Sequence, residues 1–254
     1  MARREKKPGS VGEFVRTIIY AGLIAVGIHT FLFEPFYIPS GSMVPSLLVG
    51  DYIIVNKFTY GYSHYSLPFA PDWFSGRIFG STPKRGTVIV FRPPGDPSED
   101  YIKRVIGLPG DTVQVKDSQL YINGQLVPRT YEGQYVDSSS GVPIITKYYQ
   151  EDLPGGVDHG VIKVTNGPEN FGGVDPNNTP VYTVPPGHLF MMGDNRDNSE
   201  DSRFLDGPVG YVPIENVVGP ADLIFFSINL THPLWEVWAW PFEIRWDRMF
   251  HTIR

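Results

Sequence analysis

The chain has 254 residues, of which 41% are hydrophobic and 19% charged, and its formal net charge is −6. This balance excludes an intrinsically disordered chain, and the lack of a basic stripe beyond residue 7 excludes nucleic acid as the main partner. The absence of cysteine excludes disulfides and thiolate sites, and the six histidines are too scattered for a ligand pair of the HExxH type, so we expect no metal and no cofactor.

The first element in chain order is an apolar segment over residues 14–33. A helix of this length spans roughly 30 Å, the thickness of the hydrocarbon core of a bilayer. Basic residues precede it, so the positive-inside rule places residues 1–13 in the cytoplasm and residues 34–254 outside. A cleaved signal peptide and a buried helix are the alternatives; the length of the segment and the lack of a small-x-small site at its end favour an uncleaved, single-pass anchor. The basic residues are Arg3, Arg4, Lys6 and Lys7.

Beyond the anchor the sequence predicts a mostly β fold, an extracytoplasmic antiparallel β core. Short runs rich in Val, Ile, Tyr and Phe are bounded by Gly, Pro and Asp, and Asn123-Gly124 is a strong signal for a two-residue hairpin. Two segments interrupt this pattern: residues 58–84 are read as an insertion, and residues 128–180 as a smaller inserted β-rich lobe. The predicted strands cover 51–57, 86–91, 101–106, 112–116, 119–122, 125–127, 181–184, 188–192 and 222–228.

The segment Pro39-Ser40-Gly41-Ser42 follows the anchor closely. Proline fixes φ and glycine permits backbone angles that other residues avoid, so the segment predicts a tight turn. Such a turn can expose the Ser42 hydroxyl and direct a backbone N–H toward the same small volume, which is the arrangement that acyl transfer needs. The Ser40 hydroxyl could supply a second donor. An isolated Ser-Gly-Ser is more often an ordinary polar loop.

Lys103 lies in the predicted strand 101–106, among bulky apolar neighbours. A lysine can act as a base near neutral pH only if burial lowers its pKa, and a drop of 2–3 units costs about 3–4 kcal/mol. Side chains alternate along a strand, so we expect Lys103 to be buried and Arg104, on the other face, to remain in water. The alternative is a surface strand on which both cations are solvated.

A third segment, residues 192–203, is dense in Asp and Asn. It suggests a calcium-binding loop, but the residues at loop positions 3, 6 and 12 do not fit the EF-hand pattern. A hydrogen-bonded turn that supports a nearby site explains it better. In such a turn Asp201 and Arg203 could pair, and a hydroxyl could orient the lysine amine.

Together, and in this order behind an apolar helix, the segments 36–51, 101–111 and 192–203 resemble those of the bacterial type I signal peptidases, or leader peptidases. The resemblance implies a membrane-anchored serine endopeptidase that removes N-terminal signal peptides from exported preproteins after Ala-x-Ala-like sites, through an acyl-enzyme. It implies that Ser42 is the nucleophile and Lys103 the general base. The oxyanion hole would consist of the Ser42 N–H and the Ser40 hydroxyl.

The resemblance also implies supporting roles. Ser199 corresponds to the serine that hydrogen-bonds the lysine amine, and Asp201 and Arg203 to the supporting ion pair. Ser46 stands where many members have threonine. Pockets with little space and apolar walls would select small substrate side chains. The residues implied to line them are Phe36, Ile38, Met43, Leu47, Tyr101 and Ile102.

The implied location is the bacterial cytoplasmic (inner) membrane, with preproteins and the lipid bilayer as partners and action near the protein translocation machinery. Two other functions stay open. One is a specialised Ser/Lys processing peptidase for a single secretion or conjugation partner, and the other is a membrane-tethered β domain that binds peptides without cutting them. The tryptophan-rich tail at 233–242 either seats the domain on the bilayer or packs into the core.

Overall fold

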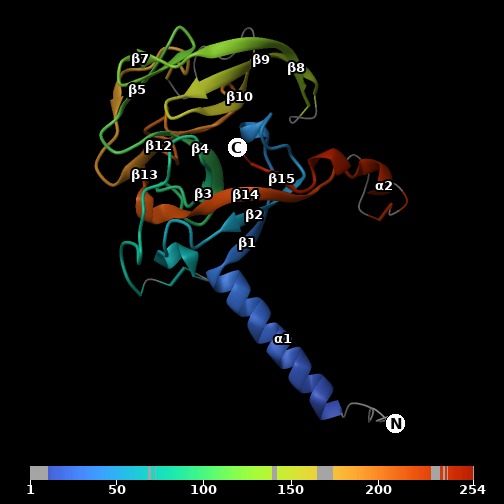
Figure 1. Ribbon diagram of the computed structural model, residues 1–254. Coiled ribbons are helices and arrows are strands. Elements are labelled where there is room, and N and C mark those ends of the chain that lie inside the picture. Colours follow the sequence, from blue (N-terminus) through green and yellow to red (C-terminus); the bar gives the residue numbers. More distant parts are fainter. Residues whose placement is uncertain are drawn as a thin grey trace.

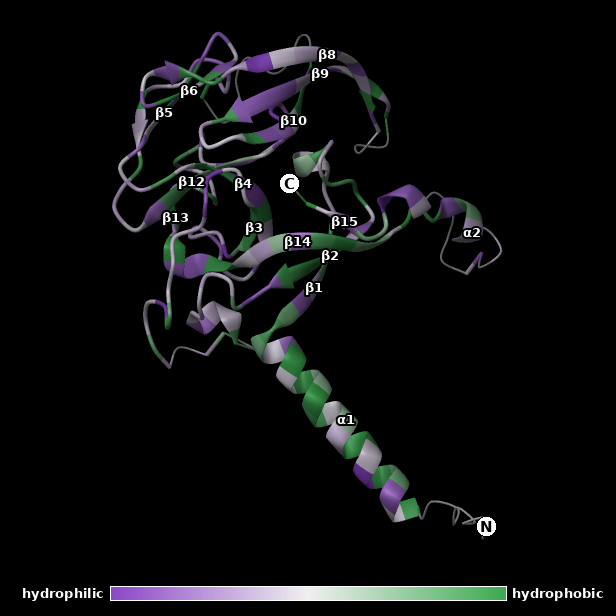
Figure 2. Ribbon diagram, viewed as in Figure 1, coloured by the Kyte–Doolittle hydropathy of each residue, from purple (hydrophilic) through white to green (hydrophobic). Residues whose placement is uncertain are grey.

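A single long helix, α1 (Val11–Phe31), projects away from the β-rich body of the chain (Figure 1). It is long and apolar enough to cross a membrane, its apolar span is not buried against the rest of the protein, and Figure 2 shows apolar residues along most of its length. The predicted N-terminal apolar helix is therefore confirmed. Its bounds differ from the predicted 14–33 because Phe33 already pairs with Asn56 in the sheet.

The computed structural model describes residues 11–67, 70–71, 73–138, 142–164, 174–229, 235–236, 238 and 240–253. The N-terminal basic residues that carry the predicted orientation lie outside the described residues, as do parts of the segments 128–180 and 233–242.

The junction between α1 and the first strand, β1 (Phe33–Tyr37), is one residue long. That residue, Leu32, accepts a hydrogen bond from the Lys57 N–H at 2.9 Å. The Tyr62 hydroxyl donates to the carbonyl of Phe31 at 2.7 Å, and Lys57 Nζ donates to the carbonyl of His29 at 3.3 Å. The C-terminal end of α1 is thus hydrogen-bonded to the β domain at several points.

The main sheet has eight strands and is antiparallel, in the order β1-β2-β14-β3-β4-β12-β13, with β15 paired to β14. The longest strand, β14, pairs with β3 in its first half and with β2 in its second, with register shifts that bend the sheet. The bounds are β2 Asp51–Asn56, β3 Val88–Phe91, β4 Tyr101–Gly107, β12 His188–Met192, β13 Val212–Pro213, β14 Val217–Ser227 and β15 His251–Thr252.

A second, four-stranded sheet has the order β11-β5-β6-β7. Its turn between β6 and β7 is the predicted Asn123-Gly124 hairpin, and both residues have positive φ, 54° and 74°, as a two-residue turn of this kind requires. Its strands are β5 Thr112–Lys116, β6 Gln119–Ile122, β7 Gln125–Leu126 and β11 Tyr182–Thr183.

The third sheet is the inserted lobe, which has the strand order β10-β9-β8 and lies beyond the main sheet from α1 (Figure 1). The sequence predicts a β-rich insertion here but assigns no individual strand. Many of the strand residues are polar or partly exposed, so the apolar alternation that indicates a strand is weak. The strands are β8 Arg129–Asp137, β9 Ile144–Leu153 and β10 Val157–Val164.

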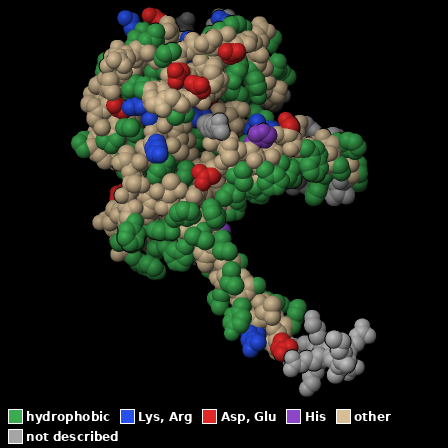
Figure 3. Space-filling view, viewed as in Figure 1, with side chains coloured by type: hydrophobic (Ala, Val, Ile, Leu, Met, Phe, Trp, Pro, Cys, Tyr) green, Lys and Arg blue, Asp and Glu red, His purple; other side chains and the backbone are tan. Residues whose placement is uncertain are grey.

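The C-terminal arm carries a short helix, α2 (Trp240–Glu243), away from the core. Trp235 is 74% exposed, Trp238 68% and Trp240 40%, so the alternative that these tryptophans pack into the core is wrong. Figure 3 shows hydrophobic side chains gathered along α1 and on this arm. The remaining short helical turns are the 3₁₀ turns Gly41–Met43, His64–Ser66, Ile214–Asn216 and Trp246–Arg248.

Candidate active site

Ser42 lies in the 3₁₀ turn Gly41–Met43, five residues beyond the end of β1. Ser40 enters the turn in an extended conformation, with φ −127° and ψ 156°, and the Val44 N–H closes it on the carbonyl of Gly41 at 3.2 Å. The first N–H groups of a helical turn have no acceptor within it, so the Ser42 N–H is available to an external partner. Ser42 is buried and Ser40 exposed, with their hydroxyl oxygens 3.5 Å apart.

Lys103 projects from β4, and its Nζ donates to Ser42 Oγ at 2.8 Å. Its side chain is buried, as the apolar flanks predict. Burial lowers the pKa of Lys103 from 10.5 to about 8, and the negative charges of Asp201 and Glu200 offset only part of that shift. A large fraction of this lysine is therefore neutral slightly above neutral pH.

Arg104 is fully buried, so the expectation that it remains in water is wrong. Its Nε and Nη2 donate to the two carboxylate oxygens of Asp194 at 2.8 and 2.6 Å, and its Nη1 donates to the carbonyl of Gly86 at 2.7 Å. Burial alone would raise the pKa of Asp194, but the charge and hydrogen bonds of Arg104, together with His159 and the Ser46 hydroxyl, outweigh it, so the pKa is lowered. The Ser46 hydroxyl donates to the same carboxylate at 2.5 Å.

Asp201 and Arg203 form the buried ion pair that the sequence predicts. Arg203 Nε and Nη2 donate to the two oxygens of the Asp201 carboxylate at 2.8 and 2.9 Å. Asp201 also accepts the Gly193 N–H at 3.0 Å. Burial acts to raise the pKa of Asp201, but the Arg203 charge and the hydrogen bonds to the carboxylate together lower it, so the carboxylate stays ionised and holds the loop.

Ser199 lies beside Gly193 in the same loop. A Cβ atom on Gly193 would lie 2.3 Å from Ser199 Oγ and 2.6 Å from the carbonyl oxygen of Ser42, so only glycine fits between them. Among the described residues Lys103 does not hydrogen-bond Ser199. The Ser199 hydroxyl has no hydrogen bond of ordinary geometry there, although it lies close enough to Asp201 to help lower that pKa.

The six residues implied to line substrate pockets divide into two groups. Ile38, Met43 and Leu47 are buried in one hydrophobic cluster, and Met43 belongs to the same 3₁₀ turn as Ser42. The partly exposed side chains are those of Phe36 and Ile102, which pack against this cluster, and Tyr101, whose ring centroid lies 5.5 Å from Lys103 Nζ.

The inserted lobe contacts the 192–203 loop through charged and polar pairs that the sequence does not single out. Arg196 forms a buried bidentate pair with Glu151 of β9, and Lys163 of β10 donates to Asp197 at 2.7 Å. The partners lie far apart in sequence within a polar segment, so no local pattern indicates them. Within the described ranges no group of three His, Asp or Glu residues is arranged to hold a metal ion.

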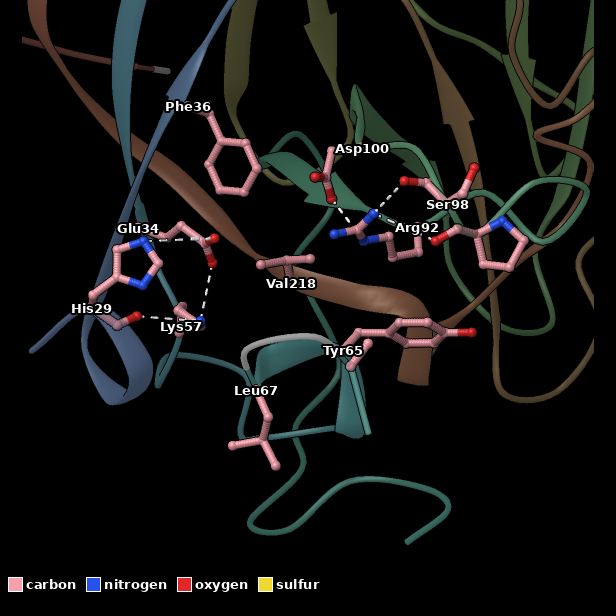
Figure 4. Close-up of a pocket in the computed structure, with 12 residues that line it drawn as sticks. His29, Glu34, Phe36, Lys57, Tyr65, Leu67, Arg92, Ser98, Asp100 and Val218 are labelled. Carbon is pink, nitrogen blue, oxygen red and sulfur yellow. Dashed lines mark hydrogen bonds and ion pairs between the residues drawn. The ribbon is translucent and has the colours of Figure 1, made fainter. Parts of the chain in front are cut away.

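A cavity of about 300 Å³ lies between the C-terminal end of α1 and the segment before β4 (Figure 4). Two ion pairs face it: Lys57 Nζ lies 3.0 Å from a Glu34 carboxylate oxygen, and Arg92 Nε lies 2.9 Å from an Asp100 oxygen. Phe36 lines the cavity as well, so the cavity adjoins the side of the site that faces the anchor.

Known proteins match the amino-acid sequence over most of the chain. The family model "Signal peptidase, peptidase S26" matches residues 11–226. Signal peptidase I of Rickettsia typhi is 43% identical over 244 residues, covering 91% of this chain and 89% of the relative, and that of Rickettsia canadensis is 38% identical over 254 residues, covering 94% and 92%. A crystal structure of a signal peptidase I from Enterococcus faecalis is 29% identical, covers 55% of this chain and 97% of that chain, and gives a TM-score of 0.32, too low for a conclusion about this chain.

Proposed function

The chain belongs to the peptidase S26 family of signal peptidases, serine endopeptidases that remove signal peptides, and from this premise we propose that Ser42 and Lys103 form its catalytic dyad. The observation that carries the proposal is the 2.8 Å hydrogen bond between Lys103 Nζ and Ser42 Oγ. A neutral amine at this distance can accept the serine proton, and the pKa of about 8 keeps enough of Lys103 neutral to do so.

The reaction proceeds in two steps. Lys103 takes the proton of Ser42 as Oγ attacks the scissile carbonyl, and the oxyanion receives hydrogen bonds from the Ser42 N–H and the Ser40 hydroxyl. Lys103 then protonates the leaving amine, which leaves an acyl-enzyme on Ser42. In the second step Lys103 takes a proton from a water molecule whose oxygen attacks the acyl carbon. The ester bond to Ser42 Oγ then breaks, the proton passes from Lys103 to Oγ, and the signal peptide is released.

The substrate is a preprotein that is cut after an Ala-x-Ala-like site, in which the first and third residues before the scissile bond are small. The burial of Ile38, Met43 and Leu47 in one packed cluster supports this preference, because a larger side chain of the substrate would have to displace these core residues. Phe36, Tyr101 and Ile102 form the walls.

The chain is membrane-anchored, and we place it in the bacterial inner membrane with α1 as a single span, its N-terminus in the cytoplasm and the β domain outside. The basic residues before α1 support this orientation. Preproteins emerge on that outer face, which puts the enzyme near the translocation machinery.

The test is cleavage of a purified preprotein with an Ala-x-Ala site by the detergent-solubilised full chain, with the product identified by mass spectrometry. Ser42→Ala and Lys103→Ala should each abolish cleavage while the chain keeps a cooperative thermal unfolding transition. Lys116→Ala, which removes an exposed lysine of β5, is the matched control and should cleave normally.

Three outcomes would contradict the proposal. Cleavage that survives in Lys103→Ala would show that another group is the base. A folded wild-type chain that retains the peptide but never cuts it would point to a binding role, whereas cleavage of one preprotein among several unrelated ones would point to a dedicated processing peptidase.

A further inference from the structure

Asn195 holds the backbone of the Ser42 turn by two hydrogen bonds. Its own N–H donates to the carbonyl of Ser42 at 3.1 Å, and its side-chain Nδ2 donates to the carbonyl of Gly41 at 3.1 Å. Nδ2 also donates to Asp137 Oδ2 at 2.8 Å. Asn195 is 1% exposed and Asp137 7%, so these bonds are shielded from water.

The bond to Gly41 matters because of the geometry of one peptide unit. The carbonyl of Gly41 and the N–H of Ser42 belong to the same planar trans peptide, in which they point in opposite directions. A donor that fixes the carbonyl therefore fixes the direction of the N–H. That N–H is the backbone donor proposed for the oxyanion.

The lobe determines how the Asn195 amide is oriented. The Gly41 carbonyl and the Asp137 carboxylate both accept hydrogen bonds, so only the NH₂ group of the amide can satisfy the two together. On the backbone, Ile162 of β10 accepts the Arg196 N–H at 3.1 Å and donates to the Asp194 carbonyl at 3.0 Å. Residues of the lobe thus hold the backbone on both sides of Asn195, through Ile162, and the Asn195 side chain, through Asp137.

We propose that Asn195 is a positioning residue that directs the Ser42 N–H into the oxyanion hole, and that Asp137 of the inserted lobe orients it. This inference rests on the proposed function, and it gives the lobe a role in catalysis through its contacts with Asn195 and its neighbours. The expected loss concerns the transition state alone, because the oxyanion exists only there.

The test compares the full chain with Asn195→Ala, with Asp137→Leu and with the isosteric double variant Asn195→Asp, Asp137→Asn. Asn195→Ala should lower kcat by about 10- to 100-fold, less than the 10²–10³-fold that removal of an oxyanion donor costs, and change KM by less than about threefold. Asp137→Leu should have a smaller effect in the same direction. Asn198→Ala, at an exposed position three residues further on, is the matched control and should leave kcat unchanged.

A second readout separates positioning from general damage to the structure. A peptide boronic acid, which forms a tetrahedral adduct with a serine, should lose affinity in Asn195→Ala by about the same factor as kcat/KM. The released product peptide, which forms no such adduct, should bind to Asn195→Ala as it does to the wild type. If Asn195→Ala fails to fold, the double variant Asn195→Asp, Asp137→Asn keeps the sizes, the net charge and the backbone bond of residue 195, and it should show the same pattern, since a carboxylate at position 195 cannot donate to Gly41.

The inference is overturned if the wild type cleaves the preprotein and a folded Asn195 variant keeps kcat within about twofold, or if KM and product binding change as much as kcat. A wild type that does not cleave refutes the proposed function instead, so the two failures are distinguishable.

Discussion

Lys103 and Arg104 are consecutive cations that are both buried, on opposite faces of β4, with opposite electrostatic surroundings. Arg104 has a carboxylate on two of its nitrogens, whereas the hydrogen bond of Lys103 goes to a neutral hydroxyl. Arg104 holds the 192–203 loop, and Lys103 lies beside Ser42, the proposed nucleophile. The strand thus places a structural charge directly next to the amine that we propose as the base.

The first prediction concerns pH. Because the proposed base is the neutral form of Lys103, kcat/KM should fall by about tenfold per pH unit below pH 8 and level off above it. The measurement is a pH–rate profile between pH 6 and 9.5, with the melting temperature recorded at each pH as a control. A flat profile over this range, with the fold intact, would contradict the role of Lys103.

The second prediction concerns the stability cost of the same amine. The folded-state pKa of Lys103 is lowered to about 8 from 10.5, so the folded chain binds fewer protons between these values and this group adds stability as pH rises through that window. Lys103→Met should therefore abolish cleavage yet raise the free energy of unfolding at pH 7 by up to about 3 kcal/mol. Denaturation in detergent at pH 7 and pH 10.5 checks this, and the gain should shrink at the higher pH. Lys116→Met, at an exposed site, should change stability at neither pH.

A third prediction follows from the buried pair of Arg104 and Asp194. Arg104→Leu leaves a buried carboxylate without its cation and should destabilise the fold by about 3–5 kcal/mol. The double variant Arg104→Leu, Asp194→Leu removes both charges and should be more stable than the single one. Chemical denaturation of both measures the difference, and equal loss in the two variants would show that the charge pairing is not what the site depends on.

A fourth prediction uses Gly193, which separates Ser199 from the carbonyl of Ser42. Gly193→Ala adds a Cβ where no space exists, which should cost about 1–3 kcal/mol and, by displacing the nucleophile, lower kcat on the order of 10²-fold. Gly27→Ala in α1 is the control, because no atom lies within 4 Å of the added Cβ. Wild-type kcat in Gly193→Ala would show that the loop can yield without moving Ser42.

Much of the fold is predictable from local pattern. The apolar helix, the mostly β class and the Asn123-Gly124 hairpin each depend on residues that are neighbours in the sequence, and each is confirmed. The strands of the inserted lobe are not individually predictable, because their many polar side chains weaken the apolar alternation.

At the site, the contact between Ser42 and Lys103 agrees with the prediction from their two motifs, while their catalytic roles stay predictions. The burial of Arg104 could not be foreseen, because its partner lies 90 positions further on and no local rule pairs them. The same holds for Asn195 and Asp137, which are 58 positions apart. Long-range polar pairs of this kind carry no periodicity, so the sequence predicts the reactive groups better than the residues that hold them.

The one-residue junction between α1 and β1 has a consequence for which bonds the enzyme can reach. Leu32 is too short a hinge to let the domain tilt freely, and hydrogen bonds from Lys57 and Tyr62 to the end of the helix restrict it further. With α1 in the bilayer as proposed, we expect Ser42, ten residues along the chain from Leu32, to stand at a fixed height above the lipid surface. The proposed peptidase would then select a scissile bond by its distance from the bilayer as well as by the residues around it.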